Sequence, residues 1–159
     1  ISPDKKILIP ASGAGCSLAE SITGYELREW KKANPDGIIV SYVNTTAEVK
    51  AWTDICCTSA NALKVVQSIP PDRKILFVPD KNLGAWIRKV TGREMELWHG
   101  DCCVHERITT DMILEKSRDY PQADILIHAV SHSSHDEAIL NLPQAYMYST
   151  AGMSRHASR

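Results

Sequence analysis

Short apolar runs alternate with helix-like segments along most of the chain. Continuous apolar residues predict strands that are buried on both faces, because a half-exposed strand would alternate apolar and polar side chains. The predicted strands lie at 6–9, 38–42, 55–57, 74–78, 94–98, 125–128 and 145–148. The predicted helices lie at 23–33, 45–52, 60–67, 80–91, 110–118 and 135–140, with a last one opening at 149–150. This order indicates an α/β fold, a parallel sheet with helices on both faces.

Several helix starts carry their own sequence signals. Thr23 is followed three residues later by Glu26, and Thr45 by Glu48, and both pairs have the spacing of a capping box. Ser59, preceded by a threonine, is expected to cap the helix at 60–67.

The chain contains landmarks that recur at nearly one spacing. Cys16 and Cys102 are 86 residues apart, and the apolar runs at 38–40 and 125–127 are 87 apart. Ser59 and Thr150, which each open a predicted helix, are 91 apart. We interpret this spacing as a tandem repeat of an α/β unit of somewhat under 90 residues.

Polar side chains with chemical potential gather at one edge of the predicted sheet. The carboxyl ends of parallel strands lie at a common edge, which is where open α/β sheets bind ligands. The residues at or just beyond those ends are Cys16, Tyr42, Asn44, Ser59, Asp80, Cys102, His105, His128 and Thr150. We therefore expect a ligand site at this edge.

Composition excludes several classes of partner. Hydrophobic residues make up 43% of the 159 positions, which is enough for a packed core. The formal net charge of −1 provides no basic surface for nucleic acid, and no apolar run approaches the roughly 20 residues of a membrane span. We expect no nucleic-acid partner, no membrane partner and a small-molecule ligand.

The five cysteines argue against a disulfide framework. Their number is odd, and four of them form the vicinal pairs 56–57 and 102–103. Reduced thiols and a cytoplasmic location fit this usage better. A generic zinc module is weakly supported, because no Cys-x-x-Cys pair occurs.

Cys16 and Cys102 are the candidate metal ligands. Thiolates from equivalent positions of two repeats could converge on one centre, and soft sulfur selects zinc, copper(I) or an iron–sulfur cluster. His105 lies close enough to Cys102 to serve the same cavity as an acid or base, although a surface imidazole is an equal alternative. Ser59 and Thr150 could bind an anion at a helix start or act as plain helix caps.

Four motifs resemble one known family in the order in which they occur. They are IVSYVNTTAEVKA at 39–51, DICCTSANA at 54–62, PDKNLG at 79–84 and WHGDCCVHE at 98–106. Together with the flanking sequence, from residue 3 to about 153, they are similar to quinolinate synthase.

The resemblance implies a fold and a cofactor. Members of that family have three α/β repeats related by pseudo-threefold symmetry around a [4Fe–4S] cluster held by three cysteines. Here Cys16 and Cys102 match two of these ligands, and the third is not in this chain. The repeats would be the end of the first at 1–19, the second at 20–104 and an incomplete third at 105–159.

The resemblance also implies a reaction in de novo NAD biosynthesis. Iminoaspartate condenses with dihydroxyacetone phosphate to quinolinate, with an open iron site acting as Lewis acid, and L-aspartate oxidase is a functional partner. The matching catalytic residues are Tyr42, His105 and His128. The matching substrate-binding residues are Tyr42, Asn44, Ser59, His128, Ser149 and Thr150.

The chain departs from the family pattern in one region. Val130 stands where the family has a glutamate expected to transfer a proton, and Tyr148 stands where the family has glycine. The loop between His128 and Ser149 is also longer. The alternative hypothesis is therefore a non-catalytic or truncated homologue that keeps the scaffold and binds a metal without turnover.

Overall fold

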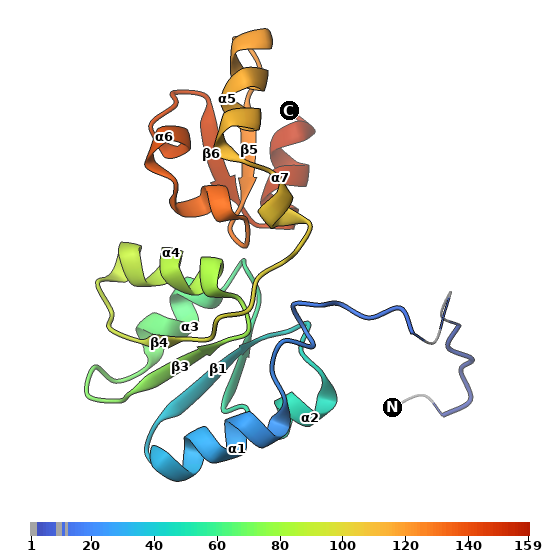
Figure 1. The fold of residues 1–159 in the computed structure, drawn as a ribbon, viewed down its shortest axis with the longest axis vertical. Coiled ribbons are helices and arrows are strands. Elements are labelled where there is room, and N and C mark those ends of the chain that lie inside the picture. Colours follow the sequence, from blue (N-terminus) through green and yellow to red (C-terminus); the bar gives the residue numbers. More distant parts are fainter. Residues whose placement is uncertain (1–2, 9–10, 12) are drawn as a thin grey trace.

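Two α/β lobes follow one another along the chain (Figure 1). The structure is a computed structural model and describes residues 3–8, 11 and 13–159. The first lobe contains α1 (Gly24–Ala33), β1 (Ile38–Tyr42), α2 (Ala47–Lys50), β2 (Ile55–Cys57), α3 (Ala62–Ser68), β3 (Ile75–Val78), α4 (Lys81–Thr91) and β4 (Glu96–Leu97). The second contains η1 (His105–Arg107), α5 (Thr110–Asp119), β5 (Ile125–His128), η2 (His132–His135), α6 (Glu137–Leu140), β6 (Ala145–Tyr148) and α7 (Thr150–Ala157).

The first lobe is built on a sheet of order β2-β1-β3-β4, in which all neighbouring strands are parallel. All four residues of β3 are buried. Phe77 faces a cluster that includes α3 and α4, whereas Leu76 faces the opposite cluster, which includes α1 and α2. The continuous apolar run at this strand therefore reflects burial on both faces, and the predicted α/β fold with helices on both faces is confirmed.

The second lobe is smaller and rests on the α3 and α4 side of the first (Figure 1). Its two strands, β5 and β6, form a parallel pair in which His128 lies opposite Tyr148. The loop after β5 reaches into the first lobe, where Ala129 and Val130 join the core cluster that contains Leu83 and Ile87. This loop fixes the end of β5 against the first lobe.

The repeat detected in the sequence is visible in the backbone. Helices α1 and α5 have the same length, and their capping threonines, Thr23 and Thr109, are 86 residues apart. Just before each helix, the Cys16 carbonyl accepts from Glu20 N–H and the Cys102 carbonyl accepts from Glu106 N–H, both at 3.0 Å. The two cysteines thus open equivalent turns. The boundaries expected after residues 19 and 104 stay a prediction.

Helix starts differ from the sequence prediction at two places. The N-cap of α2 is Thr46, because Thr45 Oγ1 turns back to donate to the Tyr42 carbonyl. Helix α3 begins at Ala62 with Asn61 as N-cap, so Ser59 does not cap it. The Asn61 side-chain oxygen accepts from Thr58 N–H at 2.6 Å, and this turn delays the helix.

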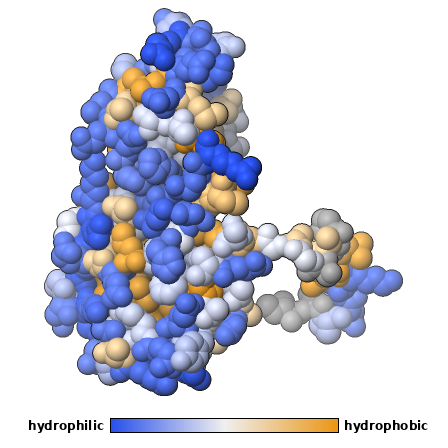
Figure 2. All heavy atoms as spheres, in the orientation of Figure 1, coloured by the Kyte–Doolittle hydropathy of each residue, from blue (hydrophilic) through white to orange (hydrophobic). Residues whose placement is uncertain are grey.

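The strand expected at 6–9 is not formed by the residues of that run that the structure describes. Lys6, Ile7 and Leu8 have no regular structure, and Ile9 lies outside the described residues. Ile7 and Leu8 are 86% and 88% exposed, on an arm that stands away from both lobes (Figures 1 and 2). No described strand lies beside them, so their apolar side chains alone do not produce a strand.

Equivalent apolar residues are buried to different degrees in the two lobes. Leu27 and Ile39 are fully buried, whereas their equivalents 86 residues later, Ile113 and Ile125, are partly exposed. In the first lobe, β3 pairs with β1 and supplies Leu76 to the buried cluster that contains Leu27 and Ile39. Within the described part of the chain, β5 pairs with β6 alone, so its apolar neighbours stay open to solvent.

We expect Leu27→Ala to lower the free energy of unfolding by about 2–5 kcal/mol, because the substitution leaves a cavity in a closed core. The matched change Ile113→Ala should cost about 1 kcal/mol, since its site is already open. Urea denaturation of both variants measures the difference. Equal losses would contradict the unequal burial of the two repeats.

Candidate functional site

His128, the last residue of β5, is the centre of a polar cluster drawn from both lobes. Ser59 Oγ, which follows β2, lies 3.4 Å from His128 Nε2, and Thr150 Oγ1, which follows β6, lies 3.2 Å from the same nitrogen. The His105 ring stacks on the His128 ring with 6.2 Å between centroids and 23° between planes. The sequence predicted these residues at one edge of a single sheet, whereas here Ser59 follows a strand of the first sheet, His128 and Thr150 lie at the ends of the second sheet's strands, and His105 begins η1.

The electrostatic setting keeps the imidazole of His128 neutral. Burial lowers its pKa from the usual 6.5, and the neighbouring His105 lowers it further. Nδ1 of His105 is buried and has no hydrogen-bond partner among the described residues. The pair therefore presents a neutral imidazole and an unused ring nitrogen, both suited to proton exchange with a ligand.

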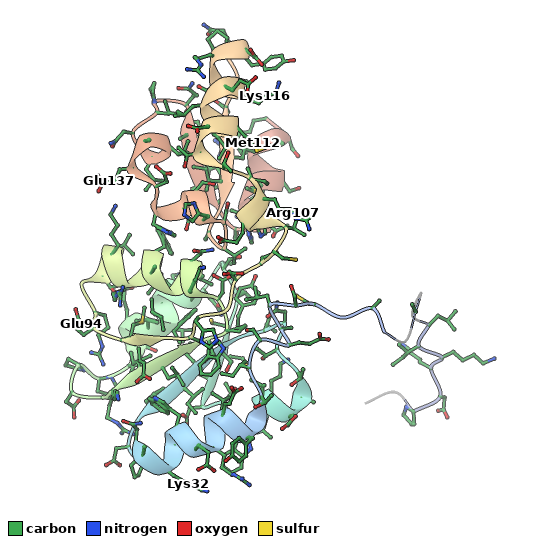
Figure 3. All side chains as sticks on the ribbon, viewed as in Figure 1. Lys32, Glu94, Arg107, Met112, Lys116 and Glu137 are labelled. Atoms are coloured by element: carbon green, nitrogen blue, oxygen red, sulfur yellow. The ribbon has the colours of Figure 1, made fainter. Side chains whose placement is uncertain are left out.

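A cavity of about 540 Å³ opens beside this cluster. His105, His128 and Thr150 line its polar side, and Ile127 and Met153 are among its apolar lining. The volume falls within the range of small-molecule sites, which combine an apolar wall with a few polar groups. Arg107 lies where the chain passes between the lobes, at the end of the second lobe that faces the first lobe (Figure 3).

The two cysteine turns meet through residues at equivalent positions. Ser17 Oγ lies 3.4 Å from Cys103 Sγ, and these residues are 86 positions apart, the same spacing as Cys16 and Cys102. Equivalent atoms of two repeats come into contact only near the axis that relates the repeats. Each candidate ligand, Cys16 and Cys102, is the residue directly before one partner of this contact.

The side chains around Cys16 and Cys102 are compatible with metal ligation but incomplete. Both are free thiols, Cys16 exposed and Cys102 partly buried, and Asn44 Nδ2 lies 3.9 Å from Cys16 Sγ. Within residues 3–8, 11 and 13–159, no group of three His, Cys, Asp or Glu side chains is arranged to hold a metal ion.

Three predicted substrate-site residues, Tyr42, Asn44 and Ser149, stay outside the His128 cluster. Tyr42 ends β1 with its ring packed against the core, and its hydroxyl makes no hydrogen bond to any part of the chain that the structure describes. Ser149 is the N-cap of α7 and accepts from Gly152 N–H at 3.3 Å. Thr150, expected to open this helix, is its first residue, and its hydroxyl is left free for His128.

The sequence placed Asp80 at the expected ligand edge, but it predicted no catalytic, substrate-binding or metal-ligating role for the start of α4. Asp80 is fully buried and caps α4, with Oδ1 accepting from Leu83 N–H at 2.8 Å. Its Oδ2 has no partner among the described residues. Burial raises the pKa of Asp80 to about 6. Asp80 also pairs with Gly100, at the start of the loop that carries Cys102.

Comparison with known proteins gives the family. The family model described as Quinolinate synthetase A protein matches residues 1–159. The chain belongs to this family. It is 57% identical over 129 residues to the quinolinate synthase of Mycobacterium sp. (strain KMS), 52% over 128 to that of Pyrobaculum aerophilum and 55% over 129 to that of Mycobacterium tuberculosis.

These matches cover 80% of the chain in each case. The matched region spans 38%, 42% and 37%, respectively, of the length of the three relatives. The aligned region of the chain thus corresponds to well under half of each of these three relatives.

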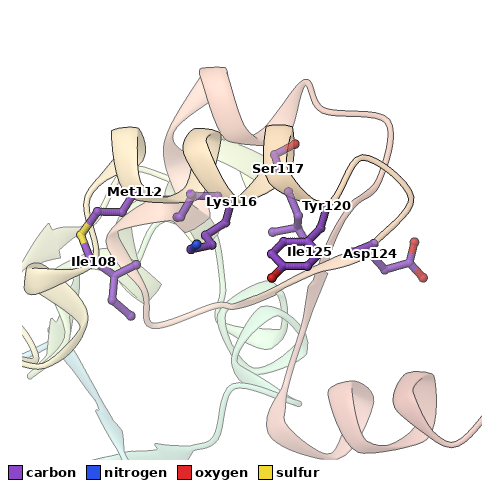
Figure 4. Close-up of a pocket in the computed structure, with 9 residues that line it drawn as sticks. Ile108, Met112, Lys116, Ser117, Tyr120, Asp124 and Ile125 are labelled. Carbon is purple, nitrogen blue, oxygen red and sulfur yellow. The ribbon is translucent and has the colours of Figure 1, made fainter.

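A second hollow in this family member is apolar (Figure 4), and it shares Ile108, Ile113 and Ile125 with the cavity that His105 and His128 line. It measures about 390 Å³ and runs along α5 and β5, with Met112, Ile113 and Tyr120 among its lining. It coincides with the face left open beside β5 and contains no catalytic constellation.

In the described residues, no helix is both long and apolar enough to cross a membrane.

The raised pKa of Asp80 predicts a pH-dependent stability. Between about pH 4 and 6 the folded chain holds a proton on Asp80 that the unfolded chain releases, so stability falls as pH rises through this window. We expect Asp80→Asn, which keeps an oxygen for Leu83 N–H, to remove about 2–3 kcal/mol of that fall. Urea denaturation at pH 4 and pH 7 measures the change in the free energy of unfolding of each protein. An identical change in the parent and in Asp80→Asn would refute this assignment.

The lowered pKa of His128 is directly measurable. We expect its ring protons, followed by NMR, to titrate with a midpoint below 6.5. In His105→Ala the midpoint should rise, because the variant loses both the neighbouring charge and part of the burial. A midpoint unaffected by this substitution would mean that the stacked pair is not formed.

Proposed function

We propose that this chain forms the central part of a quinolinate synthase, which condenses iminoaspartate with dihydroxyacetone phosphate in de novo NAD biosynthesis. The products are quinolinate, one phosphate and two waters, which balances the atoms of the two substrates. The observation that carries the proposal is the convergence of Ser59, His105 and Thr150 on His128, next to the meeting point of two equivalent cysteine turns.

A [4Fe–4S] cluster fits the donor set of the chain in part. Cys16 and Cys102 would supply two thiolates from equivalent turns, and a third ligand must come from outside residues 3–8, 11 and 13–159. When bound, such a cluster supplies a Lewis-acidic iron for a substrate oxygen. The free thiols also support a reducing compartment, and we assign the reaction to the cytoplasm.

The chain's own residues would bind the substrate and move protons. The hydroxyls of Ser59 and Thr150 flank His128 Nε2 and can donate to a carboxylate of iminoaspartate. Neutral His128 can accept a proton at Nε2 and return it, while His105 offers its unused Nδ1. Asn44 lies on the Cys16 side of the site, and Tyr42 would line it at the end of β1. L-aspartate oxidase would deliver iminoaspartate.

One observation favours a non-catalytic homologue as the second candidate. Val130 stands where the family has a proton-transferring glutamate, and its side chain is 6% exposed within the core cluster. No carboxylate can act from that position in this chain. If the chain forms quinolinate, His105 and His128 must carry the proton transfer that the glutamate would perform. If the chain binds metal but forms no quinolinate, it is the homologue that only retains the scaffold.

The cysteine assignment is tested by anaerobic reconstitution with iron and sulfide. The sample is the Mycobacterium tuberculosis quinolinate synthase carrying this chain in place of its matching region. We expect Cys102→Ser to abolish bound iron, because a ligand is lost, and Cys103→Ser to leave iron content unchanged. Iron analysis and quinolinate formation are the readouts. Iron lost only in Cys103→Ser would mean that the neighbouring thiol is the ligand.

A further inference from the structure

Two consecutive residues at the start of α4, Lys81 and Asn82, contact the loop that carries Cys102 and His105. Lys81 N–H donates to the Gly100 carbonyl at 2.8 Å. The Lys81 ammonium pairs with Asp101 Oδ2 at 2.6 Å. Asn82 Nδ2 donates to Glu106 Oε1 at 3.1 Å.

These contacts hold both ends of the loop. Gly100 and Asp101 directly precede Cys102, and Glu106 directly follows His105. Gly100 is packed so closely that an added Cβ would lie 2.4 Å from the Pro79 carbonyl oxygen. Asn82 is only 1% exposed, so its bond to a charged carboxylate is shielded from water.

The equivalent loop of the first repeat provides a matched comparison. Glu20 lies 86 positions before Glu106 and closes the equivalent turn through its backbone N–H. Its side chain is exposed, whereas that of Glu106 is partly buried under Asn82. A change at Glu20 therefore alters the same residue type in the same kind of turn without touching α4.

We propose that Lys81 and Asn82 are positioning residues, which hold the loop between Asp101 and Glu106 so that Cys102 and His105 face the His128 cluster. They do not touch substrate. Their effect passes through Asp101 and Glu106. The inference rests on the proposed function, because Cys102 and His105 matter only if that site is used.

The test uses the accessibility of Cys102 in the full chain. Iodoacetamide labelling of Cys102 is compared with that of Cys57 by mass spectrometry, in the parent protein and in its variants. Cys57 is 1% exposed, so it reports global unfolding, while Cys102 reports the loop. The ratio of the two labelling rates separates local loosening from loss of the fold.

We expect Asn82→Ala and Glu106→Ala to raise the Cys102 to Cys57 ratio about tenfold, because each removes a buried hydrogen bond to a charged group. Glu106→Gln keeps the acceptor oxygen and should restore the parent ratio. Glu20→Ala should leave the ratio unchanged. A parent-like ratio in Glu106→Ala, or a failure of Glu106→Gln to restore it, would overturn the proposal.

If Asn82→Ala or Glu106→Ala unfolds the protein, Lys81→Met tests the proposal instead. Its side chain and that of Asp101 are 39% and 35% exposed, so losing the ion pair leaves the core intact. The ratio should rise about threefold, and no rise would overturn the proposal. Labelling of Cys102 needs no iron, so the labelling test of the positioning role is independent of the iron-binding test of the proposed function. If the parent protein binds no iron, the proposed function falls, whereas an unchanged labelling ratio removes only the positioning role.

Discussion

The packing of Ala129 and Val130 into the core of the first lobe is the contact on which the candidate site depends. These residues follow His128 directly and are buried beside the α3 and α4 side chains. Apolar burial of this kind resists displacement, because any movement of the lobe would expose both side chains to water. The end of β5 is thereby held near Ser59, and a histidine of one lobe reaches a hydroxyl of the other.

The same packing gives Val130 a structural role. A glutamate at position 130 would place a carboxylate in an apolar cluster, whereas valine fills it without a desolvation cost. The interdomain contact and a proton-transferring carboxylate at this position are therefore in conflict in the observed geometry. Under the proposed function, proton transfer is assigned to the stacked pair His105 and His128.

Much of the fold could be predicted from the sequence, because its strands are continuous apolar runs and its helices carry capping threonines. Strands β1, β3 and β5 occur where these runs lie, and Thr23 forms the expected capping box. Two predicted helix starts were wrong for local reasons: the Thr46 side chain caps α2, and the Asn61 side chain accepts from Thr58 N–H in a turn that delays α3. Residues 6–8 form no strand although they belong to an apolar run, because a strand also needs a neighbouring strand to pair with.

The pairing of His128 with Thr150 was predictable from strand ends, because β5 and β6 are parallel neighbours, but the approach of Ser59 was not, because it depends on the packing of the second sheet against the first lobe. The contacts of Lys81 with Asp101 and of Asn82 with Glu106 were not predictable, because they join residues about 20 positions apart through side chains with no periodic signal. Likewise, only coordinates could reveal that Ser17 meets Cys103, its own equivalent in the second repeat.

The most direct test asks whether the two cysteine turns face one centre. In a chain with Cys56, Cys57 and Cys103 replaced by serine or alanine, the remaining thiols at Cys16 and Cys102 are treated with dibromobimane, a short reagent that bridges two nearby sulfurs. Equivalent turns in contact near one axis predict an intramolecular fluorescent bridge between Cys16 and Cys102. Labelling of each thiol singly, without a bridge, would contradict a shared metal centre.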